Sequence, residues 1–451
     1  MIIKNKEELL SHGNRDGRKI ALNIIEYALK TIDPYETVRK TVLFGNKGLI
    51  VGHLKYNLSE IRNIYVVGAG KGTLRIAEAL EDILGSRIKR GIIIEKRIQG
   101  RKLKTIRVVE GGHPIPDEVG EEGAKEVVEI AKSAQKGDLV FICIMGGSSA
   151  LMPLPVKGIS LGDKKRVTDL LLKCGATIEE INAVRKHISA IKGGRLARYI
   201  HPAEVINLIV IDEVAGLPWG PTVPDTTTFK DAVHVLKKHN LWEKVPDSVR
   251  KHLKRGLADP SLETLKPEDF EGLKVHNLVL ANNHIACEAA KKKAEELGFS
   301  AIILSTVLEG ESREVGIVLA CIAKEIEGRN RPLKPPCVLI LGGETTVTIV
   351  EGAGEGGRNQ ELALASSLKI DGSKNIVITS IGTDGTDGPT DIAGGIVDGY
   401  TLSRTREKGI DIFRNLIKHN SSYVFRTLKD AIFTGPTGTN VMDLTLVVVT
   451  A

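Results

Sequence analysis

Glycine-rich segments recur where an apolar run of the sequence stops, and two of them carry side chains suited to binding anions. Gly68-Ala69-Gly70-Lys71-Gly72 follows IYVV, and Gly146-Gly147-Ser148-Ser149 follows LVFICIM. Glycines at the end of a strand let backbone N–H groups approach an anion, and Lys71 adds a point charge. Both segments therefore indicate sites for a phosphate or carboxylate group, although each is also compatible with an ordinary strand–helix turn.

A basic stretch between residues 182 and 195 supplies further cations. Arg185, Lys192 and Arg195 are spaced so that a helix and its end bring them close to one face. A solvated helix face is the alternative explanation. If the stretch instead faces a cleft, Arg185 and Lys192 are candidate ligands of an anionic substrate or nucleotide.

The second half of the chain repeats the pattern of glycines and polar side chains. Glu344 follows Gly342-Gly343, and Thr437 lies in the donor-rich loop 434–440. Arg358 follows glycines at 354, 356 and 357 and precedes Asn359. A helix starting near Asn359 would direct its positive end and the guanidinium at one site, which favours a role in holding phosphoryl oxygens.

Acidic side chains alternate in the segment GTDGTDGPTD, residues 382–391. It resembles a calcium loop but lacks the bidentate Glu at the end. Asp384 and Asp387 after a strand would suit Mg²⁺, or another divalent cation, bridged to nucleotide phosphates. An acidic surface turn is the alternative. Together with the cations and N–H donors, these acids favour phosphoryl transfer, which depends mainly on positioning and charge stabilisation.

The composition is that of a globular protein with more than one core. The chain has 451 residues, of which 42% are hydrophobic and 26% charged, and a net charge of +7. No run approaches the roughly 20 apolar residues of a membrane span. The N-terminus has no signal-like apolar core, and the five cysteines form no CxxC pair. We expect a cytoplasmic protein that binds neither membrane nor nucleic acid.

Apolar strand-like runs alternate with helical patterns along most of the chain. This alternation predicts an α/β fold with two α/β domains. We expect an N-terminal Rossmann-like domain with a parallel sheet over residues 1–240 and a C-terminal domain with a mixed sheet over residues 270–451. The polar, helical residues 229–270 would connect the two domains, and the active site would lie in the cleft between them.

Two other classes of function stay open on the residues alone. A nicotinamide-dependent reductase is conceivable because Glu95 could bind a ribose, but Arg75 stands where a dinucleotide fingerprint needs its third glycine. The P-loop pattern also fails, because Tyr65 and Gly72 replace its first glycine and its Ser/Thr. A non-catalytic sugar-acid-binding protein would not need the acids at 384 and 387.

Nine ordered motifs together resemble the MOFRL family of glycerate kinases, typified by glycerate 2-kinases. They span roughly residues 65–445 and read VVGAGKG, GGHPIPDE, MGGSSALMPLP, INAVRKHISAIKGGRLA, GPTVPD, LGGETTVTI, GGRNQELALA, GTDGTDGPTDIAGGIVD and TGPTGTNVMDL. Some members of this family were long labelled hydroxypyruvate reductases. An NAD(P)H-dependent hydroxypyruvate reductase is therefore the alternative activity.

The resemblance implies transfer of the γ-phosphate of ATP to D-glycerate, giving 2-phosphoglycerate, with Mg²⁺ as cofactor. It also implies that Lys71 and Arg358 take the places of the family's proposed catalytic lysine and arginine. Glycerate and ATP are the expected partners, and a homodimer is left open. Residues 211–222, IDEVAGLPWGPT, depart from the family's usual SDVxGD…ASGPT, so Asp212 is not counted as a ligand.

Overall fold

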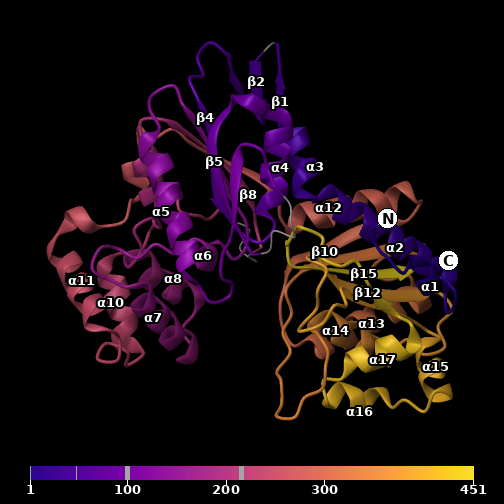
Figure 1. The fold of residues 1–451 in the computed structure, drawn as a ribbon. Helices are drawn as coiled ribbons and strands as arrows, with labels where there is room; N and C mark the ends of the chain where they lie inside the picture. Colours follow the sequence, from indigo (N-terminus) through magenta and orange to yellow (C-terminus); the bar gives the residue numbers. More distant parts are fainter. Residues whose placement is uncertain (1, 47, 97–101, 213–217) are drawn as a thin grey trace. The chain divides into compact units, whose positions relative to one another are not determined.

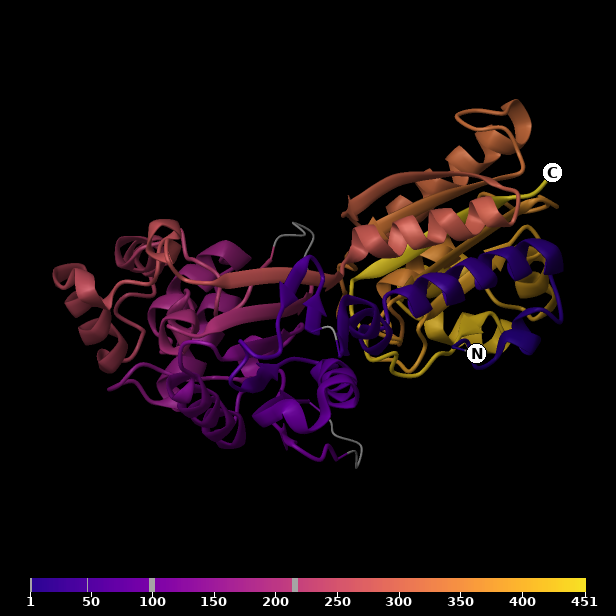
Figure 2. The same cartoon turned by 90° about the horizontal axis from the view of Figure 1, so that it is seen from above.

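The computed structural model describes residues 2–46, 48–96, 102–212 and 218–451, and the chain divides into two compact units. One unit comprises residues 38–210 and 218–280, and the other comprises residues 1–37, 211–217 and 281–451. We call them the parallel-sheet unit and the mixed-sheet unit. The prediction of two α/β domains, one with a parallel and one with a mixed sheet, is confirmed (Figures 1 and 2).

The parallel-sheet unit is built on six strands in the order β6-β5-β4-β7-β8-β9. The pairs β6/β5, β5/β4, β4/β7 and β7/β8 are all parallel. Strands β4 and β7 are buried along their whole length, as continuous apolar runs in a covered parallel sheet should be. The strands are β4 (Ile64–Ala69), β5 (Ile88–Glu95), β6 (Ile106–Glu110), β7 (Leu139–Ile144), β8 (Glu204–Val210) and β9 (Val275–Ala281), beside an antiparallel sheet of β1 (Val42–Gly45), β2 (Gly48–Val51) and β3 (Leu54–Tyr56).

Helices of this unit cover the sheet and build a second apolar cluster beside it. Phe229 belongs to that cluster, and its ring centroid lies 4.7 Å from that of the His187 imidazole. The helices are α4 (Thr73–Leu84), α5 (Glu118–Ser133), α6 (Ser148–Leu151), α7 (Leu161–Lys173), α8 (Ile178–His187), α9 (Arg195–Ile200), α10 (Phe229–Lys238) and α11 (Asp247–Ala258), with short 3₁₀ turns at Gly85–Arg87, Pro260–Leu262 and Pro267–Phe270. Helix α3 (Pro34–Thr41) spans the boundary between the two units.

The expected domain boundaries therefore need two corrections. Residues 229–270 are not a connection, because α10 and α11 bury an apolar face within the parallel-sheet unit. Residues 1–37 do not belong to the N-terminal domain expected over residues 1–240, because α2 packs on strands of the mixed sheet. The chain thus begins in the mixed-sheet unit, is assigned to it again over residues 211–217, and returns to it for good after residue 280.

The mixed-sheet unit has the strand order β10-β11-β15-β12-β13-β14. Among the described strand pairs of this sheet, only β10/β11 is parallel, and β15 runs antiparallel to both of its neighbours. Helices α2 and α12 cover one face, and α13 and α14 cover the other (Figure 1). The strands are β10 (Ser300–Leu308), β11 (Cys337–Gly343), β12 (Ile376–Gly382), β13 (Gly394–Asp398), β14 (Ala431–Ile432) and β15 (Asp443–Val449). The helices are α1 (Lys6–Leu9), α2 (Arg15–Thr31), α12 (Asn283–Glu296), α13 (Ser312–Arg329), α14 (Arg358–Ser367), α15 (Thr401–Glu407), α16 (Ile412–Ile417) and α17 (Ser421–Leu428).

A buried ion network fastens α2 to the C-terminal part of the chain. Arg18 is fully buried, and its guanidinium donates to Asp398 at 2.6 Å and to Asp430 at 2.7 Å. We expect Arg18→Met to lower the free energy of unfolding by about 3–5 kcal/mol, because it removes the cation of the buried Asp398 carboxylate and leaves Asp430 with only Arg404 and His12. Urea denaturation measures this, and Lys19→Met, an exposed cation of the same helix, is the control. A loss equal to that of the control would contradict the assignment of α2 to this unit.

Candidate active site

The first cluster of candidate residues lies at the topological switch point of the parallel sheet. The sheet order runs outward in both directions from the adjacent strands β4 and β7, which is the arrangement of a doubly wound nucleotide-binding fold. Ligands of such sheets bind at the carboxyl ends of the two strands that flank this point. The glycine loops after Ala69 and after Ile144 are those ends.

Two glycine loops are fastened to each other at this point. The N–H of Lys71 donates to the carbonyl oxygen of Gly146 at 2.8 Å. Gly70 has a φ of +150°, and a Cβ there would lie 2.6 Å from the carbonyl oxygen of Met145. No other residue type fits this close approach, so Gly70 places Lys71 and Gly146 side by side.

His113 completes this cluster. A Cβ on Gly147 would lie 2.8 Å from Cδ2 of His113 and 3.3 Å from Cγ of Lys71, so both side chains cross over this glycine. Burial, with the charges of Lys71 and Lys96, lowers the pKa of His113 to about 4. The imidazole is therefore neutral at pH 7. Sequence reasoning favoured a structural role for His113, whereas its place beside Lys71 makes it a candidate ligand.

Glu95 closes the N-terminus of α4. Its carboxylate accepts hydrogen bonds from the N–H groups of Gly72 at 2.9 Å, Leu74 at 3.2 Å and Lys96 at 2.8 Å. The side chain is only 4% exposed. Glu95 is thus engaged within the chain, which removes the ribose-binding role that a dinucleotide-dependent reductase would require of it.

The serines and the basic stretch meet in the same unit. Ser148 is buried in α6, and Ser149 accepts a hydrogen bond from the ammonium of Lys192. Arg195 does not join them, because its guanidinium donates to the carbonyl oxygens of Lys186, Ser189 and Leu262. The structure therefore brings Lys192 to Ser149 and gives Arg195 a structural role.

A second cluster lies at one edge of the mixed sheet. The pairing register aligns Gly343, the last residue of β11, with Asp443, the first residue of β15, and with Gly382, the last residue of β12. Because β15 is antiparallel to its neighbours, its beginning lies where theirs end. This places Asp443 beside Glu344 and the 382–391 loop.

Arg358 is held by two carboxylates of this cluster. Its Nε and Nη2 donate to Asp443 at 2.6 and 2.9 Å, and its Nη1 lies 2.9 Å from Glu344. Burial opposes the charge, but the contacts with both acids outweigh it and raise the pKa of the guanidinium. The side chain remains 29% exposed. Arg358 is therefore a fixed cation that retains N–H groups for a ligand.

The negative charge of this cluster exceeds that of its cation. Burial raises the pKa of Glu344; the charge of Arg358 opposes this, and the nearby carboxylates of Asp443, Asp212 and Asp384 add to it. Asp212, from the altered 211–222 segment, therefore lies near Glu344, whereas residues 213–217 lie outside the described residues. Sequence reasoning missed Asp443, although an acid directly before the apolar run LTLVVV is a signal that could have indicated it.

Three of the residues predicted to bind ligands use their side chains for hydrogen bonds within the protein. Asp387 is 1% exposed, and its carboxylate accepts from the N–H groups of Asn359 at 3.1 Å and Gln360 at 2.9 Å. Asn359, also buried, donates to Asp443 at 2.9 Å. Thr437 donates to the carbonyl oxygen of Thr383 at 2.6 Å. Asp387 thus caps α14, Asn359 orients Asp443, and Thr437 fixes the loop that carries Asp384.

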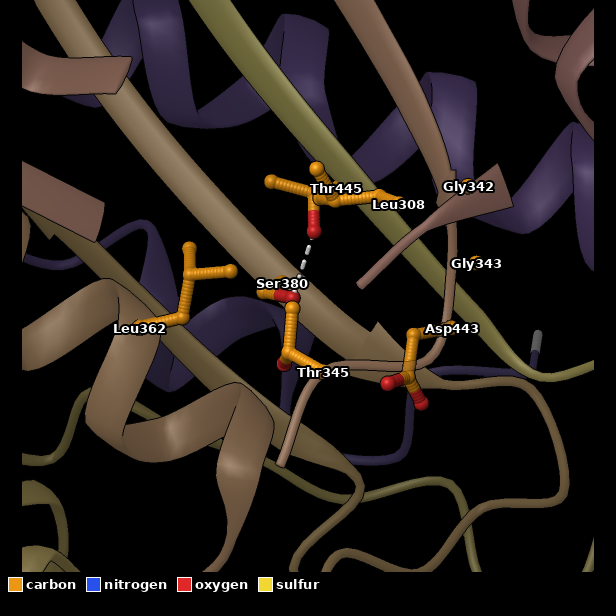
Figure 3. Close-up of a pocket in the computed structure, with 8 residues that line it drawn as sticks. All are labelled: Leu308, Gly342, Gly343, Thr345, Leu362, Ser380, Asp443 and Thr445. Carbon is orange, nitrogen blue, oxygen red and sulfur yellow. Dashed lines mark hydrogen bonds between the residues drawn. The ribbon is translucent and has the colours of Figure 1, made fainter. Parts of the chain in front are cut away.

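A small pocket lies behind this edge of the sheet. Its lining is formed by Leu308, Gly342, Gly343, Thr345, Leu362, Ser380, Asp443 and Thr445. Figure 3 shows the hydroxyls of Ser380 and Thr445 pointing toward one another, 2.7 Å apart. Ser380 also donates to Asn359 at 2.6 Å. Hydrogen bonds among Thr445, Ser380 and Asn359 therefore hold the side chain of Asn359, which in turn donates to Asp443.

In the part of the chain that the structure describes, no three His, Cys, Asp or Glu side chains converge in an arrangement that could hold a metal ion. None of the described helices combines the length and apolar character needed to cross a membrane.

Known proteins resemble the chain along nearly its whole length. The family model described as a domain of unknown function, DUF4147, matches residues 20–254, and that of the MOFRL family matches residues 337–443. A glycerate 2-kinase of Pyrococcus horikoshii is 47% identical over 439 residues, which cover 97% of this chain and 98% of the relative. The chain belongs to the MOFRL-type glycerate kinase family.

A solved structure matches the fold of this chain, and one sequence relative carries the name of another activity. The crystal structure of a glycerate kinase from Thermotoga maritima matches with a TM-score of 0.85 at 35% identity, covering 96% of this chain and 99% of that one. A protein of Agrobacterium vitis called a putative hydroxypyruvate reductase is 36% identical over 389 residues, which cover 85% of this chain and 98% of the relative. The fold is thus that of a solved glycerate kinase.

Proposed function

We propose that this chain transfers a phosphoryl group from ATP to the 2-hydroxyl of D-glycerate, giving 2-phosphoglycerate. The observation that carries the proposal is the 47% identity with a glycerate 2-kinase over nearly the full length of both chains. The site chemistry agrees with it, because Lys71 with the glycine loops and Arg358 with its acids offer fixed charges of both signs. Such fixed charges are the main catalytic need of phosphoryl transfer.

Each cluster has a distinct role in this proposal. Lys71 stabilises the oxygens of the transferring group, and backbone N–H groups at 146–149 hold an anionic part of a substrate. Ser149 and Lys192 contribute one hydroxyl and one cation there. Arg358 stabilises the charge that develops on the phosphoryl group, while Asp443 and Glu344 keep its guanidinium in one orientation.

The carboxylates fit a divalent cation only in part. Asp384 uses Oδ1 to accept from the N–H of Thr386 at 3.0 Å, whereas both oxygens of Asp387 are committed to α14. Mg²⁺ in kinases is held by one or two carboxylates together with substrate phosphates, so three converging acids are not required. We assign Asp384 as the residue that would hold it, and Asp387 as a positioning residue. When bound, Mg²⁺ would neutralise charge on the nucleotide phosphates.

Variants of the two acids should therefore behave differently. Asp384→Asn should raise the Mg²⁺ concentration needed for half-maximal rate several-fold, with little change in stability. Asp387→Asn should lower the free energy of unfolding by about 1–3 kcal/mol, because its amide N–H₂ faces the donors of Asn359 and Gln360, and it should leave the Mg²⁺ dependence unchanged. Magnesium titrations of the rate and urea denaturation check both. An unchanged Mg²⁺ dependence in Asp384→Asn would make this loop structural.

The alternative activity is reduction of hydroxypyruvate with NAD(P)H. The turn after β4 does not support this activity. Glu95 is buried and accepts hydrogen bonds from the N-terminus of α4, and Arg75 stands where a dinucleotide-binding motif has its third glycine. Two assays on one preparation test the choice: ADP release with D-glycerate, ATP and Mg²⁺, and NADH oxidation with hydroxypyruvate. We expect turnover only in the first. The active site between the domains, the homodimer and the cytoplasmic location stay predictions.

A further inference from the structure

Two cations of the parallel-sheet unit, Lys164 and Arg185, each have a buried nitrogen without a hydrogen-bond partner among the described residues. Lys164, in the first turn of α7, is 3% exposed, and Arg185 lies in the last turn of α8. The two nitrogens are Nζ of Lys164 and Nε of Arg185. None of the ion pairs of the described chain includes either side chain.

The surroundings of this pair disfavour its positive charges. Burial and the charge of Arg185 lower the pKa of Lys164 to about 7, against an opposing effect of Glu121 on α5. Burial also lowers the pKa of Arg185. Buried unpaired charges are costly, and two adjacent charges of one sign are more so. An anion between them would remove both costs.

The helix that carries Glu121 and the segment that follows α8 both contact the chain just after the second glycine loop. Gly120, the neighbour of Glu121 in α5, would place a Cβ 2.6 Å from the carbonyl oxygen of Leu151, the last residue of α6. After α8, the N–H of Ala190 donates to the carbonyl oxygen of Leu154 at 2.8 Å. Helices α5, α6, α7 and α8 accordingly form one group in Figure 1. Lys192, which follows α8, reaches Ser149 of α6.

We propose that Lys164 and Arg185 form a binding site for a small oxyanion, and that its ligand is the carboxylate of the acceptor substrate. The identity of the ligand rests on the proposed function, whereas the anion site does not. A carboxylate suits the planar fork of Arg185 and the single ammonium of Lys164. The same chemistry would also accept a phosphate group of the nucleotide or product. The burial of Lys164 favours the smaller carboxylate over a polyphosphate.

Binding measurements without turnover test this inference. Calorimetry with D-glycerate, with ATP and with inorganic phosphate would be run on the wild type, Lys164→Met and Arg185→Gln. Arg166→Gln, an exposed cation of the same helix, controls for the change in net charge. Glycerol, which has the hydroxyls of glycerate but no carboxylate, serves as the uncharged analogue.

We expect Lys164→Met and Arg185→Gln each to weaken D-glycerate binding at least tenfold and to leave ATP binding within twofold of the wild type. The melting temperature of Lys164→Met should equal or exceed that of the wild type, because an unpaired buried charge has been replaced by an apolar side chain of similar length. Glycerol should bind no better to the wild type than to either variant.

Three results would count against the proposal. Unchanged D-glycerate binding together with a lowered melting temperature would show that Lys164 is structural. Weakened binding of ATP and phosphate but not of D-glycerate would overturn the carboxylate assignment. If Arg166→Gln weakened D-glycerate binding as much, the effect would come from the change in net charge and not from a specific site. Failure of the proposed function looks different: D-glycerate would bind through Lys164 and Arg185 but would not be phosphorylated.

Discussion

Replacing Lys71 with alanine should lower kcat by about 10²- to 10³-fold, the range found when one charge-stabilising donor is removed from an active site. The KM for ATP should change far less, because the ammonium matters most when charge moves between oxygens in the transition state. The short strand–helix loops around Gly70 and Gly146 hold the backbone of Lys71 against Gly146 and place its side chain near His113.

Steady-state kinetics with ATP and D-glycerate as varied substrates measure this effect. Lys71→Arg should recover part of the loss, because it restores the charge with a different shape. An alanine variant with the kcat of the wild type would make Lys71 a solvated residue of an ordinary turn.

Arg358→Lys should also lower kcat, by about 10²-fold, while the KM for glycerate changes little. The guanidinium bridges Asp443 and Glu344 through three nitrogens, and a lysine has one nitrogen to offer in their place. The new ammonium would be drawn to one carboxylate and would leave both the other acid and the phosphoryl group without their cation.

A matched variant separates the two tasks of Arg358. Asp443→Asn keeps the arginine but removes the charge that orients it, so it should give a smaller loss of kcat than Arg358→Lys. If Arg358→Lys instead keeps kcat within a few-fold and raises only the KM for glycerate, Arg358 is a carboxylate clamp. That result would also remove the need for the site at Lys164 and Arg185.

The architecture could be predicted because the end of a strand is visible in the local sequence, as an apolar run that stops at glycines. The apolar runs before Gly68 and Gly146 are β4 and β7, and the strand before Gly342 is β11, as their patterns indicate. Lys71, Gly147 and Arg358 could be found for the same reason, since each belongs to a glycine-rich turn. At these positions, the local sequence alone is enough to place the residue at the end of a strand.

What could not be predicted depends on contacts between distant segments. Asp443 joins Arg358 only through the antiparallel register of β15, which no local pattern specifies. Asp387 has the spacing of a metal ligand, yet tertiary folding places it over the N-terminus of α14. Likewise, the amphipathic pattern of α2 indicates that this helix covers a sheet but does not indicate which of the two sheets. Nothing in the local sequence distinguishes Lys164 from an exposed lysine of a polar helix.

The identity of the product tests the central claim most directly. The chain would be incubated with D-glycerate, ATP and Mg²⁺, and the product examined by ³¹P NMR and by its consumption by enolase, which acts on 2-phosphoglycerate. We predict a single phosphomonoester that enolase consumes without added mutase, formed in proportion to ADP. A product that enolase accepts only after mutase is added would contradict transfer to the 2-hydroxyl, and NADH-dependent loss of hydroxypyruvate without ADP formation would contradict the kinase assignment altogether.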